Sequence, residues 1–283
     1  MVFEAVDEAT SSWRADSEVR RLSSAASGES HAIGSTLQEV LRLAFEVAEA
    51  SGGAFDPTVG PLVRLWGFGP DGAQAQPTEQ ELQRELVRVG WESYRLEQGE
   101  LTTLVDGLEL DLSGVAKGYA VDGMAAVLAE AGAQDFLVEI GGEFVAYGER
   151  PGGGAWRLGI ERPAVQPGAA PVLWRAVDVS GRALATSGNY RNVRGAGDQR
   201  YGHTIDPRTG RPVSHNTASV SVLAPTCALA DALATALLVL GPEHSQALLD
   251  AYPGVEAIFL VEDPLVEGAG GLREVTLGAS PPR

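Results

Sequence analysis

One apolar segment, SVSVLAPTCALADALATALLVLGP at residues 219–242, constrains the fold more than any other stretch of the chain. Its alternating start predicts a strand, and the part rich in alanine and leucine predicts a helix that is initiated by Pro225 and stopped by a Gly-Pro pair. A helix that is apolar on all sides is typical of a buried position. We therefore expect this helix to be buried.

The same helix contains a lone charged residue, Asp231, followed four residues later by Thr235. Residues four apart lie on one helix face with Cβ atoms about 5–6 Å apart, so a carboxylate and a hydroxyl could converge on one hard cation. The alternative is structural: Asp231 accepts hydrogen bonds from a neighbouring loop, and Thr235 bonds back to its own helix. A buried carboxylate needs a partner in either case.

The segment LDLSGVAKGYAVDG places Asp111 at the end of an expected strand and Lys117 at the start of a helix. Lys117 is the only lysine in the chain, which indicates a site that needs a compact ammonium group, for instance against a phosphate or a ribose oxygen. Chance retention of one lysine is the alternative. The turn at Ser113 and Gly114 directs backbone groups at a helix start, where anions bind readily.

Three glycine-marked stretches have the composition of ligand contacts. In FDPTVGPLVRLWGFGP, Trp66 and Phe68 flank Gly67 and could line a flat ring. In VEIGGEFVAYG, a glycine pair interrupts a strand pattern, which usually marks a bulge or a close ligand approach. In ALATSGNYRN, Ser187 lies in an expected polar turn that follows a strand.

The stretch HTIDPRTGRPVSH brackets a turn between His203 and His215. Proline at the second turn position and glycine at its end are strong turn signals, so His203 is expected on a rigid corner at a strand edge, as a general base requires. A structural histidine is the second interpretation. A zinc site is the third, because the sequence offers no spaced histidine or cysteine to complete one.

The remaining pattern predicts one α+β domain over residues 1–283, with two lobes and with helices flanking mixed or antiparallel sheets. The stripe of Leu37, Val40 and Leu41 predicts a helix capped by Ser35 and stopped by Gly52. Thr78 and Glu81 predict a capping box. A strand meander is expected from Tyr94, a helix over 119–131, and further strands after it.

Charge excludes some functions and restricts others. The formal net charge of −17 argues against nucleic-acid binding, and a phosphorylated ligand would require local positive charge from a metal ion or a few chosen side chains. The sequence has no apolar run of membrane-spanning length and no recognisable export signal. The chain as written would be cytoplasmic, but its single cysteine leaves both a reducing and an oxidising compartment open, so the location is not assigned.

Together these stretches resemble the FAD:protein FMN transferases, the ApbE-like family once described as thiamine-biosynthesis lipoproteins. The blocks run in order from SSWRADSEVRRL through GGAFDPTVGPLVRLWGFG, LDLSGVAKGYAVDG, VEIGGEFVAYG and ALATSGNYR to GHTIDPRTGRPVSH and ASVSVLAPTCALADALATALLVLG. Several consecutive blocks over most of the chain make the resemblance specific. It implies a T-fold-like α+β architecture.

The resemblance also implies an activity and its residues. It implies a Mg²⁺-dependent enzyme that passes FMN from FAD to a Ser or Thr hydroxyl of an acceptor flavoprotein subunit with a Ser/Thr-Gly-Ala-Ser/Thr type motif, releasing AMP. His203 matches the histidine implicated in transfer, and Gly114, Asp231 and Thr235 match the Mg²⁺ ligands. The implied FAD contacts are Trp13, Trp66, Gly67, Phe68, Asp111, Lys117, Ser187 and Ile205.

Two other functions are compatible with the same residues. An FAD pyrophosphatase would use water as the acceptor, and a flavin-binding protein would do no chemistry. Family members usually begin with an export or lipoprotein signal and a first strand, which we expect this chain to lack, and many are exported or membrane-anchored. Trp13 replaces the usual tyrosine, and Glu143 follows the glycine pair where aspartate is more usual.

Overall fold

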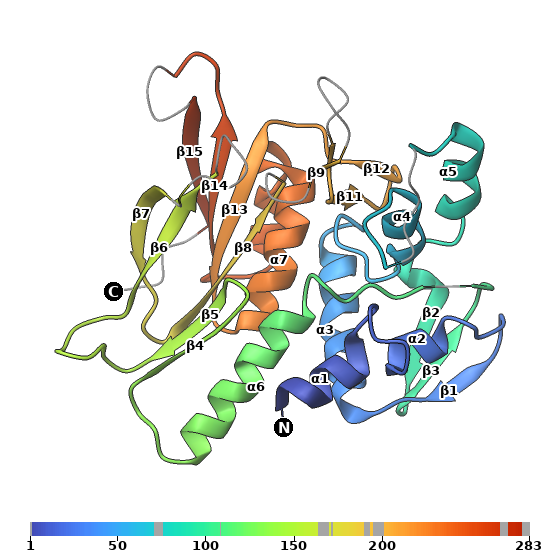
Figure 1. The fold of residues 1–283 in the computed structure, drawn as a ribbon, viewed down its shortest axis with the longest axis horizontal. Coiled ribbons are helices and arrows are strands. Elements are labelled where there is room, and N and C mark those ends of the chain that lie inside the picture. The colour runs from blue at the N-terminus through green and yellow to red at the C-terminus, as the bar shows by residue number, and fades with distance from the viewer. Residues whose placement is uncertain are drawn as a thin grey trace. The chain divides into compact units, whose positions relative to one another are not determined.

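The computed structural model describes residues 2–70, 76–107, 109–163, 170, 172–189, 193–194, 201–266 and 271–278. These residues form two compact units. The first contains residues 1–116 and 205–213, and the second contains residues 117–204 and 214–283. Each unit combines helices with antiparallel strands, as the sequence predicts for an α+β protein (Figure 1). The expectation of one domain stays a prediction.

The first unit is mostly helical. Its helices are α1 (Val2–Thr10), α2 (Glu18–Leu22), α3 (Ser35–Ala50), α4 (Gly60–Leu65), α5 (Glu79–Leu86) and the short η1 (Trp91–Ser93). The buried stripe of α3 confirms the predicted pattern, and the capping box of α5 is present, with the Thr78 hydroxyl accepting from the N–H of Glu81. Ser35, however, is the first residue of α3 and not its cap. Gly34 takes the cap position, and the Glu18 carboxylate accepts its N–H.

The strands of the first unit form two small sheets. One has the order β1 (Ser30–Ala32), β3 (Glu100–Thr103), β2 (Tyr94–Glu97), and the other pairs β11 (Ile205–Asp206) with β12 (Arg211–Pro212). The meander expected from Tyr94 is thus confirmed for β2 and β3. Helix α3 contacts this sheet through Phe45, whose ring lies 6.1 Å from that of Tyr94.

In the second unit, six described strands form one antiparallel sheet. Their order is β15 (Leu272–Gly278), β14 (Glu256–Glu262), β13 (Thr217–Ala224), β8 (Arg182–Gly188), β5 (Glu143–Tyr147), β4 (Phe136–Ile140). Two further pairs join β6 (Arg157–Arg162) to β7 (Val172–Asp178), and β9 (Val193–Arg194) to β10 (Tyr201–Gly202). The helices are α6 (Ala116–Glu130), α7 (Cys227–Leu240), η3 (Pro242–His244) and α8 (Gln246–Asp250).

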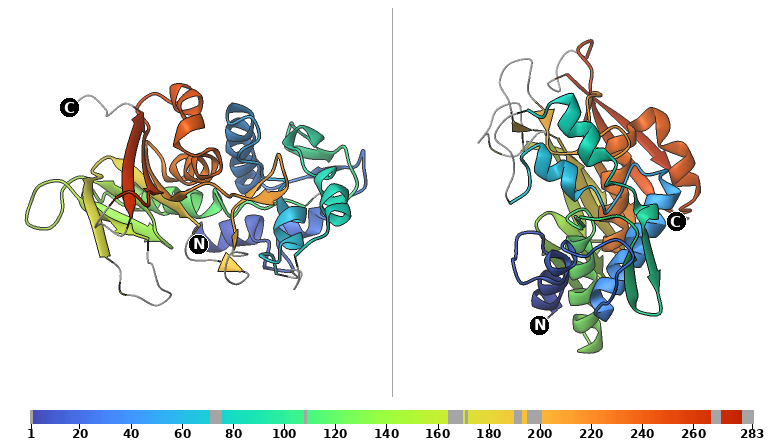
Figure 2. Two further views of the ribbon diagram at one scale, coloured as in Figure 1. Left: turned by 90° about the horizontal axis from the view of Figure 1, so that it is seen from above. Right: turned by 90° about the vertical axis from the view of Figure 1, so that its right-hand side faces the viewer.

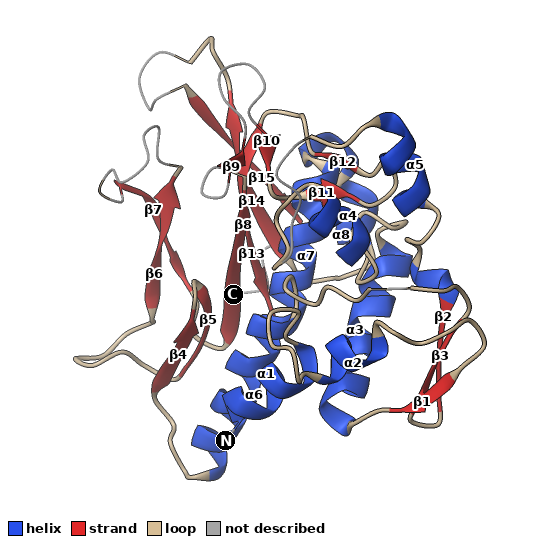
Figure 3. Ribbon diagram, turned by 45° about the vertical axis from the view of Figure 1, so that its right-hand side comes forward, coloured by secondary structure: helices blue, strands red, loops and turns tan. Residues whose placement is uncertain are grey.

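The two faces of the six-stranded sheet are covered differently. Helix α7 packs along β8 and β13 on one face, and the β6–β7 hairpin lies on the other (Figure 3). Helix α8 contacts β15 on the same side as α7 (Figure 2). Alternation along each strand sends Leu184, Leu223 and Ile258 toward the hairpin, where they form a buried cluster. The opposite side chains pack against α7.

Helix α7 is the centre of this unit. It ends at Gly241, whose φ of 71° no ordinary helix residue adopts easily, so the predicted stop is confirmed. The start differs from the prediction, because Thr226 caps the helix and Pro225 precedes that cap instead of occupying the first helical position. The leucines Leu233, Leu237 and Leu238 are completely buried. Burying each of them contributes about 1.5–3 kcal/mol, which makes α7 a main source of the unit's stability.

Helix α6 approaches α7 very closely. A Cβ atom at Gly118 would lie 2.3 Å from the carbonyl oxygen of Cys227, far inside van der Waals contact. Only glycine fits at this crossing. The close approach brings the backbone of α6 within hydrogen-bonding distance of the side chains on α7.

The glycine pair Gly141 and Gly142 has a different role from the one expected. It is the two-residue turn of a hairpin, because Ile140 pairs with Glu143 and both glycines have positive φ, 64° and 102°. A turn of this kind matches the twist of the two strands and favours glycine at both positions. The strand pattern on either side therefore belongs to two strands, β4 and β5.

None of the described helices is both long and apolar enough to cross a lipid bilayer.

Replacing Gly118 with alanine should destabilise the protein. In an unobstructed helix the substitution would stabilise by about 1 kcal/mol, but the contact with Cys227 should reverse the sign and cost about 1–3 kcal/mol through overpacking. Urea unfolding of wild type and Gly118→Ala measures the difference. An unchanged or higher free energy of unfolding would show that α6 and α7 can separate without cost.

Candidate functional site

Asp231 lies in the first half of α7 and is only 3% exposed. Its Oδ2 accepts the N–H of Gly118 at 3.1 Å, and its Oδ1 lies 3.4 Å from Nζ of Lys117. Both partners come from the start of α6. The lone charge of the apolar helix is therefore matched by one ammonium group and one backbone N–H.

Lys117 lies between two carboxylates. Its Nζ is 2.9 Å from Oε1 of Glu143 on β5, and its stem passes the hairpin turn at Gly141. Burial lowers the pKa of Lys117, but the charges of Asp231 and Glu143 outweigh burial and raise it, so the ammonium form is stabilised. Lys117 is 42% exposed, so its charge can act on a ligand as well as on Asp231 and Glu143.

Glu143 is the residue that the sequence interpretation left outside the site. Burial and the charge of Asp231 raise its pKa to about 7, against the stabilising effect of Lys117. Its Oε2 is buried, and within the described part of the chain it accepts no hydrogen bond. The only sequence signal for Glu143 is its place after the glycine pair.

Thr235 follows Asp231 by one turn of α7, as predicted. Its hydroxyl lies 3.3 Å from that of Ser187, which belongs to β8. Ser187 was expected in a polar turn, but β8 extends to Gly188 because it pairs with β13 as far as Ser219. The sheet thus brings the Ser187 hydroxyl to α7.

The donor atoms of this cluster fit a hard divalent cation. Asp231 and Thr235 offer a carboxylate and a hydroxyl, and Mg²⁺ takes few protein ligands of this kind together with water and phosphate oxygens. No group of three or more His, Cys, Asp or Glu residues that could hold a metal occurs among the residues the structure describes. A cation here would need further ligands from backbone, water or substrate.

His203 directly follows β10 and is half-buried, with its Nδ1 atom inside the protein. Asn189 binds the chain after it and lies close to the chain before it. The Asn189 Oδ1 accepts the N–H of Thr204 at 3.3 Å, and a Cβ at Gly202 would lie 2.6 Å from the same oxygen. The histidine is thus on a fixed segment, as a general base requires.

His215 has a structural role. Its Nδ1 accepts the N–H of Thr217 at 3.3 Å, so its Nε2 carries the proton and donates to the carbonyl of Val239 at 3.2 Å. It thereby satisfies a carbonyl in the last turn of α7. With both nitrogens engaged in this way, His215 is not available as a zinc ligand.

Asp111 and Gly114 belong to the first unit. Asp111 does not end a strand, because its N–H donates to the carbonyl of Pro57 at 2.7 Å and its Oδ1 accepts the N–H of Ser113 at 2.9 Å. This local turn leads into α6 through Gly114. The roles of Asp111 in FAD binding and of Gly114 in metal binding stay predictions.

Trp66 lies in the core of the first unit. The residue is 8% exposed, and its indole N–H donates to the carbonyl of Gly210 at 2.7 Å, at the end of the predicted Asp-Pro-Arg-Thr-Gly turn. Ile205, before that turn, is also buried. Little of Trp66 is open to a ligand, whereas Phe68 is half-buried, and the roles of both residues in FAD binding stay predictions. Gly67, with a φ of 89°, turns the chain between these two rings.

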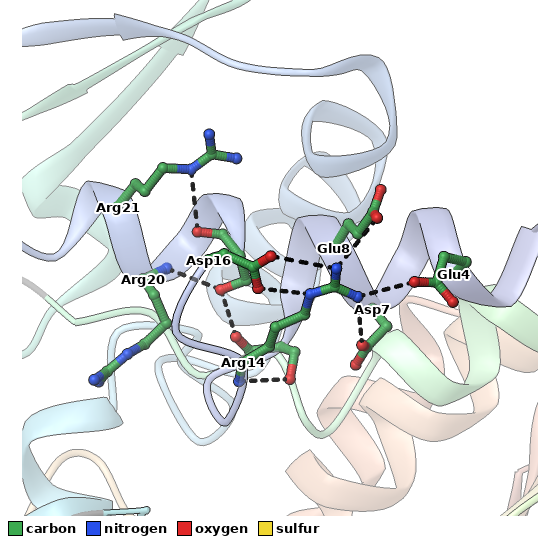
Figure 4. Close-up of polar contacts among 9 residues, drawn as sticks. Glu4, Asp7, Glu8, Arg14, Asp16, Arg20 and Arg21 are labelled. Atoms are coloured by element: carbon green, nitrogen blue, oxygen red, sulfur yellow. Dashed lines mark hydrogen bonds and ion pairs between the residues drawn. The ribbon is translucent and has the colours of Figure 1, made fainter.

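Trp13 is 68% exposed and lies on a loop that ion pairs hold in place. The neighbouring Arg14 forms ion pairs with Glu4, Asp7, Glu8 and Asp16, at 2.7–3.3 Å (Figure 4). The Ser17 hydroxyl also donates to the carbonyl of Ser11 across the base of the loop. An exposed indole on a fixed loop is suited to contact a flat ligand.

Comparison with known proteins gives the chain its family. The model of the ApbE family matches residues 1–259, nearly the whole chain. The chain belongs to the ApbE family. An FAD:protein FMN transferase of Vibrio cholerae is 38% identical over 251 residues, which make up 88% of this chain and 74% of the relative. Membership identifies the chain as a transferase, as its sequence motifs predicted.

Solved structures of the family agree with the fold. The flavin transferase ApbE from Vibrio cholerae aligns with a TM-score of 0.86 at 36% identity, over 97% of this chain and 85% of the other. The apo form of the flavinyl transferase ApbE of Pseudomonas stutzeri gives 0.84 at 35% identity, over 97% and 84%. The α+β architecture expected from the resemblance is confirmed.

Replacing Glu143 with glutamine should flatten the pH dependence of stability. Folding raises the pKa of Glu143 from 4.5 to about 7. Between these two pH values the folded protein keeps the Glu143 proton and the unfolded chain releases it. The free energy of unfolding therefore falls as the pH rises from 4.5 to 7. Glu143→Gln has no such proton to lose. Urea unfolding of both proteins in EDTA, from pH 4.5 to 7, tests this. Parallel curves would contradict the raised pKa.

Proposed function

We propose that this chain transfers FMN from FAD to a Ser or Thr hydroxyl of an acceptor flavoprotein subunit and releases AMP. The observation that carries the proposal is the cluster of Asp231, Lys117 and Thr235, which joins a buried carboxylate, the only lysine and a hydroxyl. Family membership and the names of the relatives support the same activity. A protein that only bound flavin would not need such a buried charged group.

The chemistry makes specific demands on these residues. The acceptor hydroxyl oxygen forms a bond to the FMN-side phosphorus, and the bond from that phosphorus to the bridging oxygen breaks. AMP departs with the bridging oxygen, and the hydroxyl proton must be removed. A divalent cation, when bound, would neutralise charge that develops on the phosphates.

Each residue has a role in this scheme. Asp231 and Thr235 would hold Mg²⁺, and the role of Gly114 as a backbone ligand stays a prediction. The Lys117 ammonium would offset phosphate charge in a chain whose net charge is −17. His203 would accept the hydroxyl proton at Nε2, because its Nδ1 is buried.

FAD contacts are proposed for each unit separately. In the first unit they are the exposed ring of Trp13, the side chains of Phe68 and Asp111, and the backbone near Trp66, Gly67 and Ile205. In the second unit they are Lys117 and Ser187. The acceptor is expected to present a Ser/Thr-Gly-Ala-Ser/Thr type motif.

The direct test incubates the protein with FAD, Mg²⁺ and an acceptor that bears this motif. We expect covalently fluorescent acceptor and an equal amount of AMP, and neither product when EDTA replaces Mg²⁺. AMP and FMN without labelled acceptor would instead identify a pyrophosphatase. FAD binding with no product at all would identify a flavin-binding protein.

His203→Ala should slow transfer by about 10²–10⁴-fold, the usual contribution of a general base, while FAD affinity stays near the wild-type value. Initial rates of acceptor labelling and a fluorescence titration of FAD measure the two quantities. His244→Ala, which removes an exposed histidine on η3, is the matched control and should retain full activity. Full transfer by His203→Ala at saturating FAD and Mg²⁺ would exclude His203 as the base.

A further inference from the structure

The Asp122 carboxylate on α6 accepts two hydrogen bonds from the first turn of α7. One of its oxygens accepts the N–H of Cys227 and the other accepts the N–H of Ala228, both at 2.8 Å. A carboxylate is well suited to the start of a helix, where backbone N–H groups lack partners and the helix dipole is positive. Two bonds from one rigid group fix both the place and the direction of these amides.

Asp122 follows Gly118 by one turn, so both residues lie on the face of α6 that meets α7. Gly118 packs against the carbonyl of Cys227, and its N–H donates to Oδ2 of Asp231. Asp231 in turn follows Cys227 by one turn of α7. One face of α6 therefore holds both ends of the helical turn that carries the buried carboxylate.

We propose that Asp122 is a positioning residue, which sets where α7 stands along α6 and thereby brings Asp231 to Lys117. Its two bonds go to the backbone of Cys227 and Ala228, four and three residues before Asp231, so it acts through the helix and not on the reacting atoms. The consequence for FMN transfer rests on the proposed function. The geometric role does not.

Helix α7 offers a matched control for this role. Thr226 caps the same turn with its own hydroxyl, which accepts the N–H of Leu229 at 3.4 Å. This bond lies within the segment that forms α7 and makes no link to α6. Removing it weakens the helix start without releasing α7 from α6, whereas removing the Asp122 carboxylate does both.

The sole lysine provides a probe of the geometry that needs no activity. Protein grown with lysine labelled with ¹³C at Cε gives one side-chain resonance, that of Lys117, which reports the carboxylates around its ammonium group. We expect Asp122→Asn and Asp122→Ala to move this resonance toward its position in an Asp231→Asn reference. Thr226→Ala should leave it at the wild-type position, even at an equal loss of thermal stability.

The dependence of the transfer rate on Mg²⁺ concentration tests the functional consequence of this role. If FMN transfer is the activity, the Mg²⁺ concentration for half-maximal rate should rise by about 10- to 100-fold in the Asp122 variants, as for other residues that orient metal ligands, and stay unchanged in Thr226→Ala. If the chain transfers no FMN, the resonance alone still decides the geometric claim.

A wild-type Lys117 resonance in folded Asp122→Asn and Asp122→Ala would overturn the proposal and leave Asp122 a simple cap. Asp122→Asn keeps the shape of the side chain and one acceptor oxygen, so it decides if Asp122→Ala does not fold. Loss of the fold in Asp122→Asn, with Thr226→Ala intact, would also overturn it, because the role would then be structural.

Discussion

The burial of one carboxylate, Asp231, inside an apolar helix is the interaction on which the candidate site depends. Removing a charge from water costs several kcal/mol unless partners compensate it. Here the partners are the Lys117 ammonium and the N–H of Gly118, both from the start of α6. Their approach requires a glycine at the helix crossing. A well-packed apolar residue would be a less costly occupant of this position, and this cost is the reason that we propose a chemical role for the charge.

The distribution of positive charge in the chain supports a role for Lys117 in binding an anionic ligand. The chain carries 38 acidic and 21 basic side chains, so its overall charge repels an anionic ligand. Such a ligand can bind only where positive charge is locally available. Arg14 shows how arginine is used elsewhere: one guanidinium is surrounded by four carboxylates and fastens a loop. Lys117 is different, because its compact ammonium lies beside two buried carboxylates and remains partly exposed. That arrangement leaves charge available to a phosphate.

The sequence predicted those features that depend on local pattern. The end of α7, the capping box of α5 and the placing of Lys117 at a helix start follow from turn chemistry and from periodicity. Features that depend on long-range partners could not be predicted. Glu143 and Asp122 join the site through contacts with residues that lie far away in the sequence, and the burial of Trp66 follows from its bond to Gly210. Tertiary packing decides all three.

The most direct test of the central claim is the thermal unfolding midpoint of Asp231→Asn, measured without metal and with Mg²⁺. Burial raises the pKa of Asp231, so its ionised form is unfavourable in the fold. The neutral amide should therefore raise the midpoint of the metal-free protein. Mg²⁺ should raise the midpoint of the wild type and leave that of the variant unchanged. The account would be contradicted if the metal-free variant were less stable than the wild type and if Mg²⁺ raised its midpoint as much as that of the wild type. In that case the Asp231 charge would stabilise the fold and would not be needed to bind the cation.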